Sequence, residues 1–332
     1  MEIRSYRQAV VSGLKWLLTQ QDADGSFKPM EHGINTFHKI PYALALTGQM
    51  ERGSRLCAWI QQQVMDEEGD FTRRFDREGP LTSFYHYGNS WLVMGAHRLG
   101  QYGMSMRAAD FLSTMQHPQT GGFLTLGPDS SLDGMQDMMT SALAGLAMLT
   151  TGHLPEAEAT GGFLVSMYDR QPKLGSQLLF VQQKGDRLVN EWPEDQAQAF
   201  SLTLRGPDQW YFVPGLAAGF LARLYDVTAN EDYLRVAQGY VQFADSSGSD
   251  RYASPNSWWL GWGAAMLYAI TGVAAHRAIA EAVCDHMVES QMSNGSWSAG
   301  CMGYEPPAPI IDATAEAMVA LTEILQALVV GE

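Results

Sequence analysis

Residues 289–300 read ESQMSNGSWSAG and place Gln291, Gly295 and Trp297 in the spacing Q-x3-G-x-W. The stretch follows an apolar segment with helical periodicity, so the glycine stands where a helix would end. Glycine suits that position because it adopts positive φ without steric cost, and the aromatic side chain two residues later can fold back between neighbouring helices. If the pattern recurs along the chain, it marks an internal repeat and thereby the architecture.

The pattern recurs three more times, with phenylalanine as the aromatic residue. The copies are QDADGSF at 21–27, DEEGDF at 66–71 and HPQTGGF at 117–123, the last preceded by Gln116. Each copy again follows an apolar run with helical spacing. Four turns of one form in a single chain indicate a repeated helical unit.

Helical segments of two kinds alternate along the sequence. One kind is amphipathic, and the other is apolar on almost every face and rich in alanine and glycine, which is typical of a helix that is buried on all sides. The amphipathic segments are 7–20, 52–65, 105–116, 155–169, 231–244 and 275–291. The apolar segments are 36–47, 85–99, 136–151, 210–227, 256–271 and 312–328.

These segments form six pairs of one outer and one inner helix. The centres of the inner segments follow one another at intervals of about 50, 51, 75, 46 and 56 residues, and the long interval contains an insertion at 171–207. Within it, 176–192 alternates apolar and polar residues around Lys184–Asp186, which predicts a β-hairpin. We therefore predict a single all-α domain over 1–332, an (α/α)6 barrel with a small hairpin insertion. An open helical solenoid is the competing geometry.

The composition restricts the possible partners. The net charge is −15 with only five lysines, and no basic cluster stands out, so no nucleic-acid partner is expected. No apolar run is expected to reach transmembrane length, and the N-terminus lacks the apolar core of a signal peptide. The scattered Cys57, Cys284 and Cys301 favour a reducing compartment. The expectation is an acidic cytoplasmic protein, and the sequence leaves its oligomeric state open.

The Q-x3-G-x-[FW] copies resemble the QW repeats of the terpenoid cyclase and protein prenyltransferase toroid family, which includes squalene–hopene cyclases. Gln21–Phe27 and Gln291–Trp297 carry the match, and the six-hairpin pattern covers nearly the whole chain. The resemblance implies an α/α toroid and the cyclisation of an isoprenoid. The same barrel is also used by six-hairpin glycosidases and sugar epimerases, so the fold alone does not select the chemistry.

The sequence departs from this family at its chemical motifs. It contains neither the D-x-D-D stretch of hopene cyclases nor the D-D-x-x-D stretch of ionising terpene synthases, and no Asp/Cys/His cluster supplies the zinc site of prenyltransferases. The chain is therefore expected to be a divergent cyclase or another enzyme in the same barrel.

The active site of such a barrel is expected where loops meet the N-terminal ends of the inner helices, because these ends attract anions. The substrate-binding candidates there are mainly aromatic, and aromatic faces stabilise carbocations. They are Lys39, Tyr42, Tyr85, Tyr87, Trp210, Tyr211, Trp258, Trp259 and Trp262. The spacing places Trp258 and Trp262 on one helix face. Stacking on sugar rings and ordinary core packing are the alternative roles of these aromatic residues.

Two pairs of carboxylates are candidates for catalysis. Asp133 and Asp137, like Asp312 and Glu316, are four residues apart and share a helix face if the segment is helical. Such a pair can hold Mg²⁺ through oxygen ligands or act as general acid and base. Asp137, Asp312, Glu316 and His86 are the candidate catalytic residues, and Asp133 and Asp137 are the candidate Mg²⁺ ligands; no other cofactor is expected. A helix N-cap is the alternative role of Asp312, and a structural hydrogen bond that of His86.

Three enzymatic hypotheses follow. The first is a terpenoid-type cyclase that acts on a prenyl diphosphate or a prenylated polyene in an aromatic-lined cavity. The second is a metal-free cyclase or isomerase of secondary metabolism, including a pericyclase, and insensitivity to a chelator would distinguish it. The third is a glycoside hydrolase or sugar epimerase. The apolar inner helices and 18 methionines favour a hydrophobic small molecule. A non-catalytic scaffold is disfavoured because carboxylates buried without a role are costly.

Overall fold

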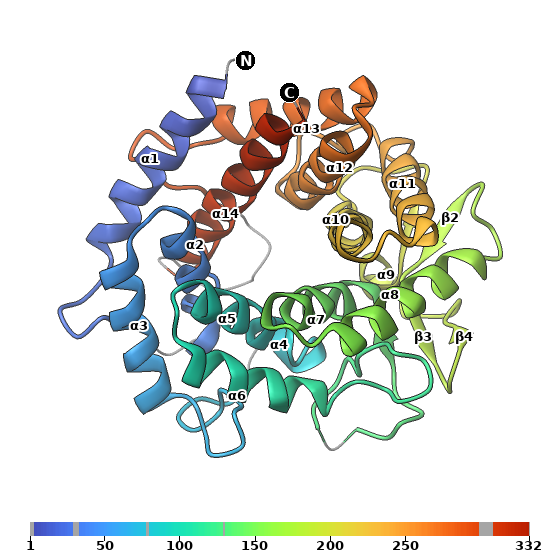
Figure 1. Ribbon diagram of the computed structural model, residues 1–332. Helices are drawn as coiled ribbons and strands as arrows, with labels where there is room; N and C mark the ends of the chain where they lie inside the picture. Colours follow the sequence, from blue (N-terminus) through green and yellow to red (C-terminus); the bar gives the residue numbers. More distant parts are fainter. Residues whose placement is uncertain (1–2, 29–32, 78–79, 129, 299–307, 332) are drawn as a thin grey trace.

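The computed structural model describes residues 3–28, 33–77, 80–128, 130–298 and 308–331, and its helices form two concentric rings (Figure 1). The inner ring consists of α2 (Ile40–Leu46), α5 (Tyr87–Arg98), α7 (Met138–Thr151), α10 (Phe212–Thr228), α12 (Trp258–Thr271) and α14 (Ala308–Val330). The outer ring consists of α1 (Ile3–Thr19), α3 (Met50–Gln63), α6 (Tyr102–Ser113), α8 (Leu154–Asp169), α11 (Glu231–Asp245) and α13 (Ala274–Glu289). Each inner helix contacts the next one, and α14 contacts α2. The predicted (α/α)6 barrel is therefore confirmed, as a closed ring.

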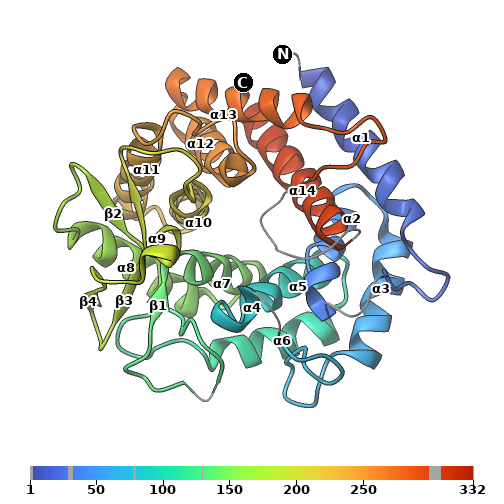
Figure 2. The same cartoon turned by 180° about the vertical axis from the view of Figure 1, so that it is seen from behind.

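Short elements precede the inner helices on one side of the ring, which Figure 2 views from behind. They are α4 (Pro80–Ser83), β1 (Gln136–Asp137), α9 (Ala197–Phe200) and the 3-10 turns η1 (Gly33–Thr36), η2 (Glu194–Gln196) and η3 (Pro255–Ser257). The N-terminal ends of the inner helices lie on this side. It is therefore the mouth of the barrel, where the sequence analysis expects the active site.

The repeated turns join neighbouring outer helices. The side-chain amide of Gln21 donates to the carbonyl of Gly25 in its own turn at 3.0 Å and to the carbonyl of Arg52 in α3 at 3.1 Å. Gln116 makes the same pair of bonds, to its own turn at 2.9 Å and to the carbonyl of Glu156 in α8 at 2.8 Å. Each glutamine thus satisfies a carbonyl of the next outer helix and fixes the angle between successive repeats.

The copy at 291–297 closes the ring. Gln291 donates to its own turn at 2.7 Å and to the carbonyl of Ala9 in α1 at 2.9 Å, across 282 residues of sequence. Gly295 has a φ of 95°, and a Cβ there would lie 2.5 Å from the carbonyl oxygen of Ser12, so only glycine permits this approach to α1. The stretch that predicts the fold is therefore also the contact between its last outer helix and its first.

The aromatic residue of every repeated turn is buried between the two rings. The four side chains are at most 1% exposed: Phe27, Phe71, Phe123 and Trp297. The backbone N–H of Trp297 donates to the hydroxyl of Thr314 in α14 at 3.0 Å, and that of Phe123 donates to Ser141 in α7 at 3.0 Å. The turns consequently connect outer helices to the inner ring as well as to one another.

The insertion between α8 and α10 contains the predicted hairpin. Strands β3 (Val181–Gln183) and β4 (Arg187–Leu188) pair antiparallel around a turn in which Lys184 has a φ of 51°. The sheet extends beyond the hairpin, because β3 also pairs with β1 at the start of α7. A second sheet pairs β2 (Gln177–Leu179) with β5 (Ser201–Thr203). The insertion is thereby attached to the mouth side of the barrel.

Helix α14 departs from the expectation that no apolar run reaches transmembrane length. Its residues Pro309–Val330 are long and apolar enough to cross a membrane, with a mean hydropathy of 1.5. Of the most apolar 18 residues, 72% are buried inside the ring, where α14 contacts α1, α2, α12 and α13. This position accounts for its composition, since an inner helix is covered on all sides. Cys57 and Cys284 are buried free thiols, and Cys301 lies outside the described residues.

Candidate active site

A buried cluster of one ammonium and two carboxylates lies at the start of α2. Lys39 immediately precedes this helix, and its Nζ lies 2.7 Å from Oδ2 of Asp312 and 2.5 Å from Oε2 of Glu316. The side chains of Lys39, Asp312 and Glu316 are 3%, 5% and 19% exposed. The two carboxylates face the same lysine because they are one helical turn apart in α14. Asp312 is not an N-cap, since α14 begins four residues earlier.

The cluster carries one negative charge when both carboxylates are ionised. Burial raises the pKa of Asp312, and Lys39 only partly offsets this effect. Burial would lower the pKa of Lys39, but the two carboxylates outweigh it and hold that pKa well above its ordinary value. Lys39 therefore stays charged. Asp312 is the group in the cluster whose surroundings favour the protonated form.

His38 lies beside the free oxygen of Asp312. Its Nδ1 lies 2.8 Å from the carbonyl oxygen of Ile34, and its Nε2 lies 3.7 Å from Oδ1 of Asp312. Burial and the neighbouring Lys39 lower the pKa of His38 to about 3, so its imidazole is neutral. The Ile34 carbonyl requires the ring proton on Nδ1, which leaves the lone pair of Nε2 directed at Asp312. Within the described part of the chain, neither Nε2 of His38 nor Oδ1 of Asp312 has a hydrogen-bond partner.

Aromatic side chains adjoin these charged groups. The indole Nε1 of Trp259 donates to Oε1 of Glu316 at 2.7 Å, and Nζ of Lys39 lies 5.6 Å from the ring centre of Tyr87. Trp91 and Trp262 flank Trp259, with ring centres 5.2 and 5.6 Å away. The structure thus brings Asp312 and Glu316 of α14 together with four further sequence candidates: Lys39, Tyr87, Trp259 and Trp262. Trp91 was missed because it lies within an apolar segment and carries no distinguishing signal.

A second charged cluster blocks the middle of the barrel below the first. Glu323 accepts from the hydroxyl of Tyr42 at 2.5 Å, from Arg98 at 3.3 Å and from Arg223. Tyr42 therefore lies in the interior, and its predicted position at the mouth is wrong. Glu323 follows Glu316 by seven residues, two helical turns, and this spacing in an apolar helix was the signal that could have revealed it.

The space between the two clusters is almost completely filled. Its cavity measures about 10 Å³, which is room for a single water molecule. The lining residues are Tyr42, Trp91, Met94, Leu143, Leu146, Leu216, Arg223, Trp259, Trp262 and Glu323. The interior of the barrel is therefore closed between the two clusters.

Asp137 and Asp133 do not form the predicted helical pair. Asp137 is the N-cap of α7, and its oxygens accept from the backbone N–H of Thr140 at 2.8 Å, from the hydroxyl of Thr140 at 2.5 Å and from the hydroxyl of Thr125 at 2.9 Å. Asp133 lies in an exposed turn before the helix begins. The two residues do not share a helix face, because the segment between them is a turn and a short strand.

These two aspartates do not fit a Mg²⁺ site. The lone pairs of Asp137 that a metal ion would need already accept hydrogen bonds. Among the residues that the structure describes, no group of three or more His, Cys, Asp or Glu side chains has the arrangement of a metal site.

His86 and Tyr85 belong to neighbouring networks. Nε2 of His86 lies 2.9 Å from the carbonyl oxygen of Leu124, and burial lowers the pKa of His86 to about 4. This contact matches the structural alternative for His86. The hydroxyl of Tyr85 donates to Oδ2 of Asp70 at 2.5 Å, and the guanidinium of Arg77 lies 4.7 Å from the centre of its ring. Burial, with the Asp70 hydrogen bond, raises the pKa of Tyr85 to about 12.

The remaining aromatic candidates lie apart from the Lys39 cluster. Trp210 is half-buried with its ring centre 5.9 Å from that of Phe84. Tyr211 is buried and donates to Oδ1 of Asp250 at 2.6 Å. Trp258 is 2% exposed, and its Nε1 has no partner. Trp258 and Trp262 both lie in α12, and the ring of Trp262 makes an edge-to-face contact with that of Trp259.

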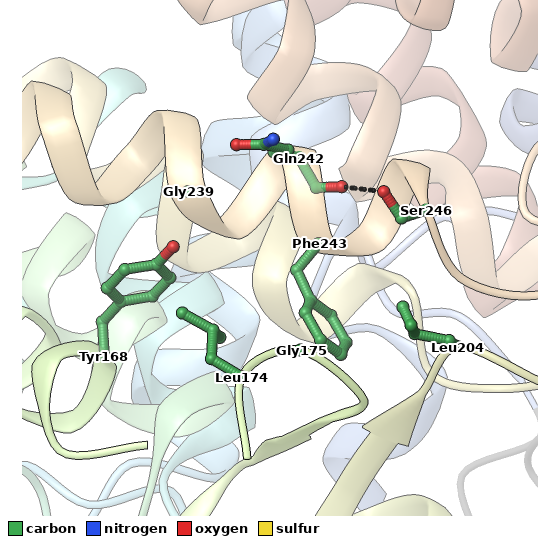
Figure 3. A pocket seen from close by; sticks show the side chains of 8 residues that line it. All are labelled: Tyr168, Leu174, Gly175, Leu204, Gly239, Gln242, Phe243 and Ser246. Carbon is green, nitrogen blue, oxygen red and sulfur yellow. Dashed lines mark hydrogen bonds between the residues drawn. The ribbon is translucent and has the colours of Figure 1, made fainter. Parts of the chain in front are cut away.

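A larger groove of about 400 Å³ lies on the outside of the barrel (Figure 3). Its lining residues come from α8, α11 and the insertion: Tyr168, Leu174, Gly175, Leu204, Gly239, Gln242, Phe243 and Ser246. Figure 3 shows the hydroxyl of Ser246 bonded to the backbone carbonyl of Gln242. No acid or base lines this groove, so the candidate active site is the cluster inside the barrel.

Proteins whose solved structures have the same architecture catalyse different reactions. D-mannose isomerase superposes with a TM-score of 0.70 at 13% identity over 97% of both chains. An unsaturated glucuronyl hydrolase specific for heparin gives a TM-score of 0.64 at 12% identity, over 98% of this chain and 96% of that one. The type II terpene cyclase MstE from Scytonema gives 0.63 at 13% identity, over 99% of this chain and all of that one. No protein-family model matches the sequence, and no curated protein matches it. The likeness defines an α/α-toroid fold and leaves the chemistry to the site.

Proposed function

We propose that this protein is a terpenoid-type cyclase that begins its reaction by protonating an isoprenoid polyene, with Asp312 as the proton donor. The observation that carries the proposal is the free Oδ1 of this buried carboxyl group, which lies beside His38 in a cluster that Tyr87 and Trp259 adjoin. A carboxyl group kept in its acid form by burial is a suitable general acid. The other oxygen is fixed by Lys39 at 2.7 Å, so the acidic proton is directed through Oδ1.

The steps conserve atoms and electrons. The proton of Asp312 adds to a carbon of one alkene, and the resulting cation is attacked by the next alkene to form a ring. Tyr87, which is half-buried beside Lys39, supplies an aromatic face that stabilises the cation. Glu316 accepts the final proton, and Lys39, bonded to both carboxylates, connects the base to the acid for the next cycle. The product is an isomer of the substrate.

The test is an incubation in D2O with farnesyl diphosphate, geranylgeranyl diphosphate and geranylgeranyl dihydroxybenzoate, each with Mg²⁺ and with chelator. Protonation by a solvent-exchanged carboxyl group places one deuterium in each cyclic product and releases no pyrophosphate. We expect this label, read by mass spectrometry, with chelator present. Release of pyrophosphate that depends on Mg²⁺ would contradict the proposal and indicate an ionising cyclase. A cyclic product without deuterium would indicate the pericyclase alternative.

A sugar isomerase is the second candidate, because a neutral histidine adjoins a carboxyl group. Nε2 of His38 has a free lone pair 3.7 Å from Asp312, which is the arrangement of a base beside an acid. D-mannose isomerase has the same fold. Incubation with D-mannose and other hexoses, followed by chromatography, separates the candidates. Interconversion of a hexose, with no turnover of the isoprenoids, would favour the second candidate.

A further inference from the structure

Arg77 is a buried cation with hydrogen-bond donors to spare. Its side chain is 6% exposed, and Nη2 donates to Oδ1 of Asp70 at 2.7 Å and to Oδ1 of Asn89. Its Nε and Nη1 are buried and have no hydrogen-bond partner among the residues that the structure describes. Arg73 and Arg74, which precede it in the sequence, are exposed. Of the three arginines in this loop, only Arg77 points its charge into the protein.

The neighbours of Arg77 cannot satisfy the free donors. Oδ1 of Asp70 accepts from the backbone of Phe71, from Asn89 and from Arg77, and Oδ2 accepts from the hydroxyl of Tyr85. Asp70 therefore holds the guanidinium in place from one side and is itself fully used. A buried donor that lacks an acceptor is unfavourable, so a rigid guanidinium with unpaired N–H groups is suited to an acceptor that arrives with a ligand.

This site adjoins the Lys39 cluster across the first turn of α5. Asn89, which binds Arg77, follows Gly88, and a Cβ on Gly88 would lie 3.6 Å from Cβ of His38. His38 in turn lies against Asp312. The positive end of the α5 dipole is also here, and its N-cap His86 makes no side-chain capping bond. An anion at Arg77 would therefore be separated from the proposed acid, Asp312, by the first turn of α5 and by His38.

We propose that Arg77 binds the oxyanion of the substrate's head group, a carboxylate or a phosphate, with Nη1 as the principal donor. The description of the substrate as an isoprenoid with an acidic head rests on the proposed function, whereas the anion site does not. Nη1 carries two N–H groups, and charge-assisted hydrogen bonds to an oxyanion are stronger than bonds to neutral acceptors. The head group bound at Arg77 directs the polyene toward Asp312.

Binding of simple anions tests the site without any turnover. Isothermal titration with benzoate represents a carboxylate, and titration with inorganic pyrophosphate represents a phosphate. We expect one of the two to bind the wild-type protein and to bind Arg77→Lys at least tenfold more weakly. A lysine retains the ion pair with Asp70 but lacks the planar fork of donors. Arg74→Lys, at an exposed position in the same loop, is the matched control and should bind as the wild type does.

A second variant keeps the test decisive if Arg77→Lys does not fold. Asn89→Asp keeps an acceptor for Arg77 but replaces the amide that donates to Asp70 with a second carboxylate. The added negative charge lies beside the guanidinium, so anion affinity should again fall at least tenfold. The proposal is overturned if neither anion binds the wild type, or if the folded variants bind as tightly as the wild type. A tenfold loss without deuterium incorporation would uphold the anion site and contradict only the cyclase.

Discussion

Asp312 and Asp137 are both buried aspartates near the starts of inner helices, yet they meet different donors. Burial raises the pKa of each. Asp137 accepts only from neutral N–H and O–H groups of its own helix start and of Thr125. Asp312 is paired with an ammonium 273 residues away and retains a free oxygen beside His38. The comparison teaches that burial and residue type do not separate the two aspartates, whereas their partners do: Asp312 keeps an unpaired oxygen beside a fixed charge, which is why it is the proposed acid.

The largest expected effect is on catalysis. Asp312→Asn removes the proton but keeps the size of the side chain, so turnover should fall by about 10²- to 10⁴-fold, the usual contribution of a general acid. Asp137→Asn should retain turnover, because asparagine caps a helix as well as aspartate does. Product formation and the midpoint of thermal unfolding should be measured for both. Equal losses in the two folded variants would remove the distinction between them.

The next effect is on stability. Lys39→Met leaves Asp312 and Glu316 without their cation, and breaking a buried ion pair costs about 3–5 kcal/mol. Lys28→Met is the matched control, because Lys28 is 74% exposed and its pair with Asp22 contributes little. Urea unfolding at pH 7 measures both. A loss below about 1 kcal/mol in Lys39→Met would show that the cluster tolerates the unpaired carboxylates.

The pH dependence of the free energy of unfolding tests the surroundings of Asp312, because His38 lies beside Asp312 and not beside Asp137. The pKa of His38, about 3, lies below the ordinary value of 6.5. Between these values the unfolded chain holds a proton that the folded protein lacks, so stability falls as the pH decreases from 6.5 toward 3. The slope for one histidine is about 1.4 kcal/mol per pH unit. His38→Asn should reduce the loss between pH 6.5 and 5 by about 2 kcal/mol. Urea unfolding at both pH values measures it, and parallel wild-type and variant curves would contradict a neutral His38.

The smallest expected effect concerns the cap. Asp137→Ala should lower the free energy of unfolding by about 1 kcal/mol, because it removes the acceptor for the N–H of Thr140. Asp137→Asn should change it by less than about half of that amount. Thermal and urea unfolding are the measurements. If the free energy of unfolding fell by several kcal/mol in both variants, the charge of Asp137 would have a role that capping does not explain.

The repeat made most of the fold predictable. The turns at Gln21, Gln116 and Gln291 have local signatures, and the apolar inner segments follow from the packing of a ring. Lys39, Asp312 and Glu316 could be singled out as residues of unusual type for their helices. Their contact could not be derived, because it depends on α14 lying next to α2 after the ring has closed.

For other residues of the candidate site, a correct prediction required the helix start or the helix face to be known to within one or two residues. Asp137 is followed three positions later by Thr140, which supplies both the N–H and the hydroxyl of the cap, and a capping interpretation was available from that spacing. Trp259, not Trp258, contacts Glu316, and a single step along a helix turns a side chain by about 100°. Sequence spacing therefore identified the segment and left the facing residue undetermined.

The separation of Lys39 from its carboxylates has a consequence for the synthesis of the protein. At about 5–20 residues per second, the ribosome adds the 273 residues between Lys39 and Asp312 in about 14 to 55 seconds. During that time the nascent chain already carries Lys39 and Tyr42, while the helix that provides their acidic partners does not exist. The charged centre of the barrel can therefore assemble only after α14 has been synthesised, and a chain truncated before residue 312 would contain a lysine directed at an unfinished core.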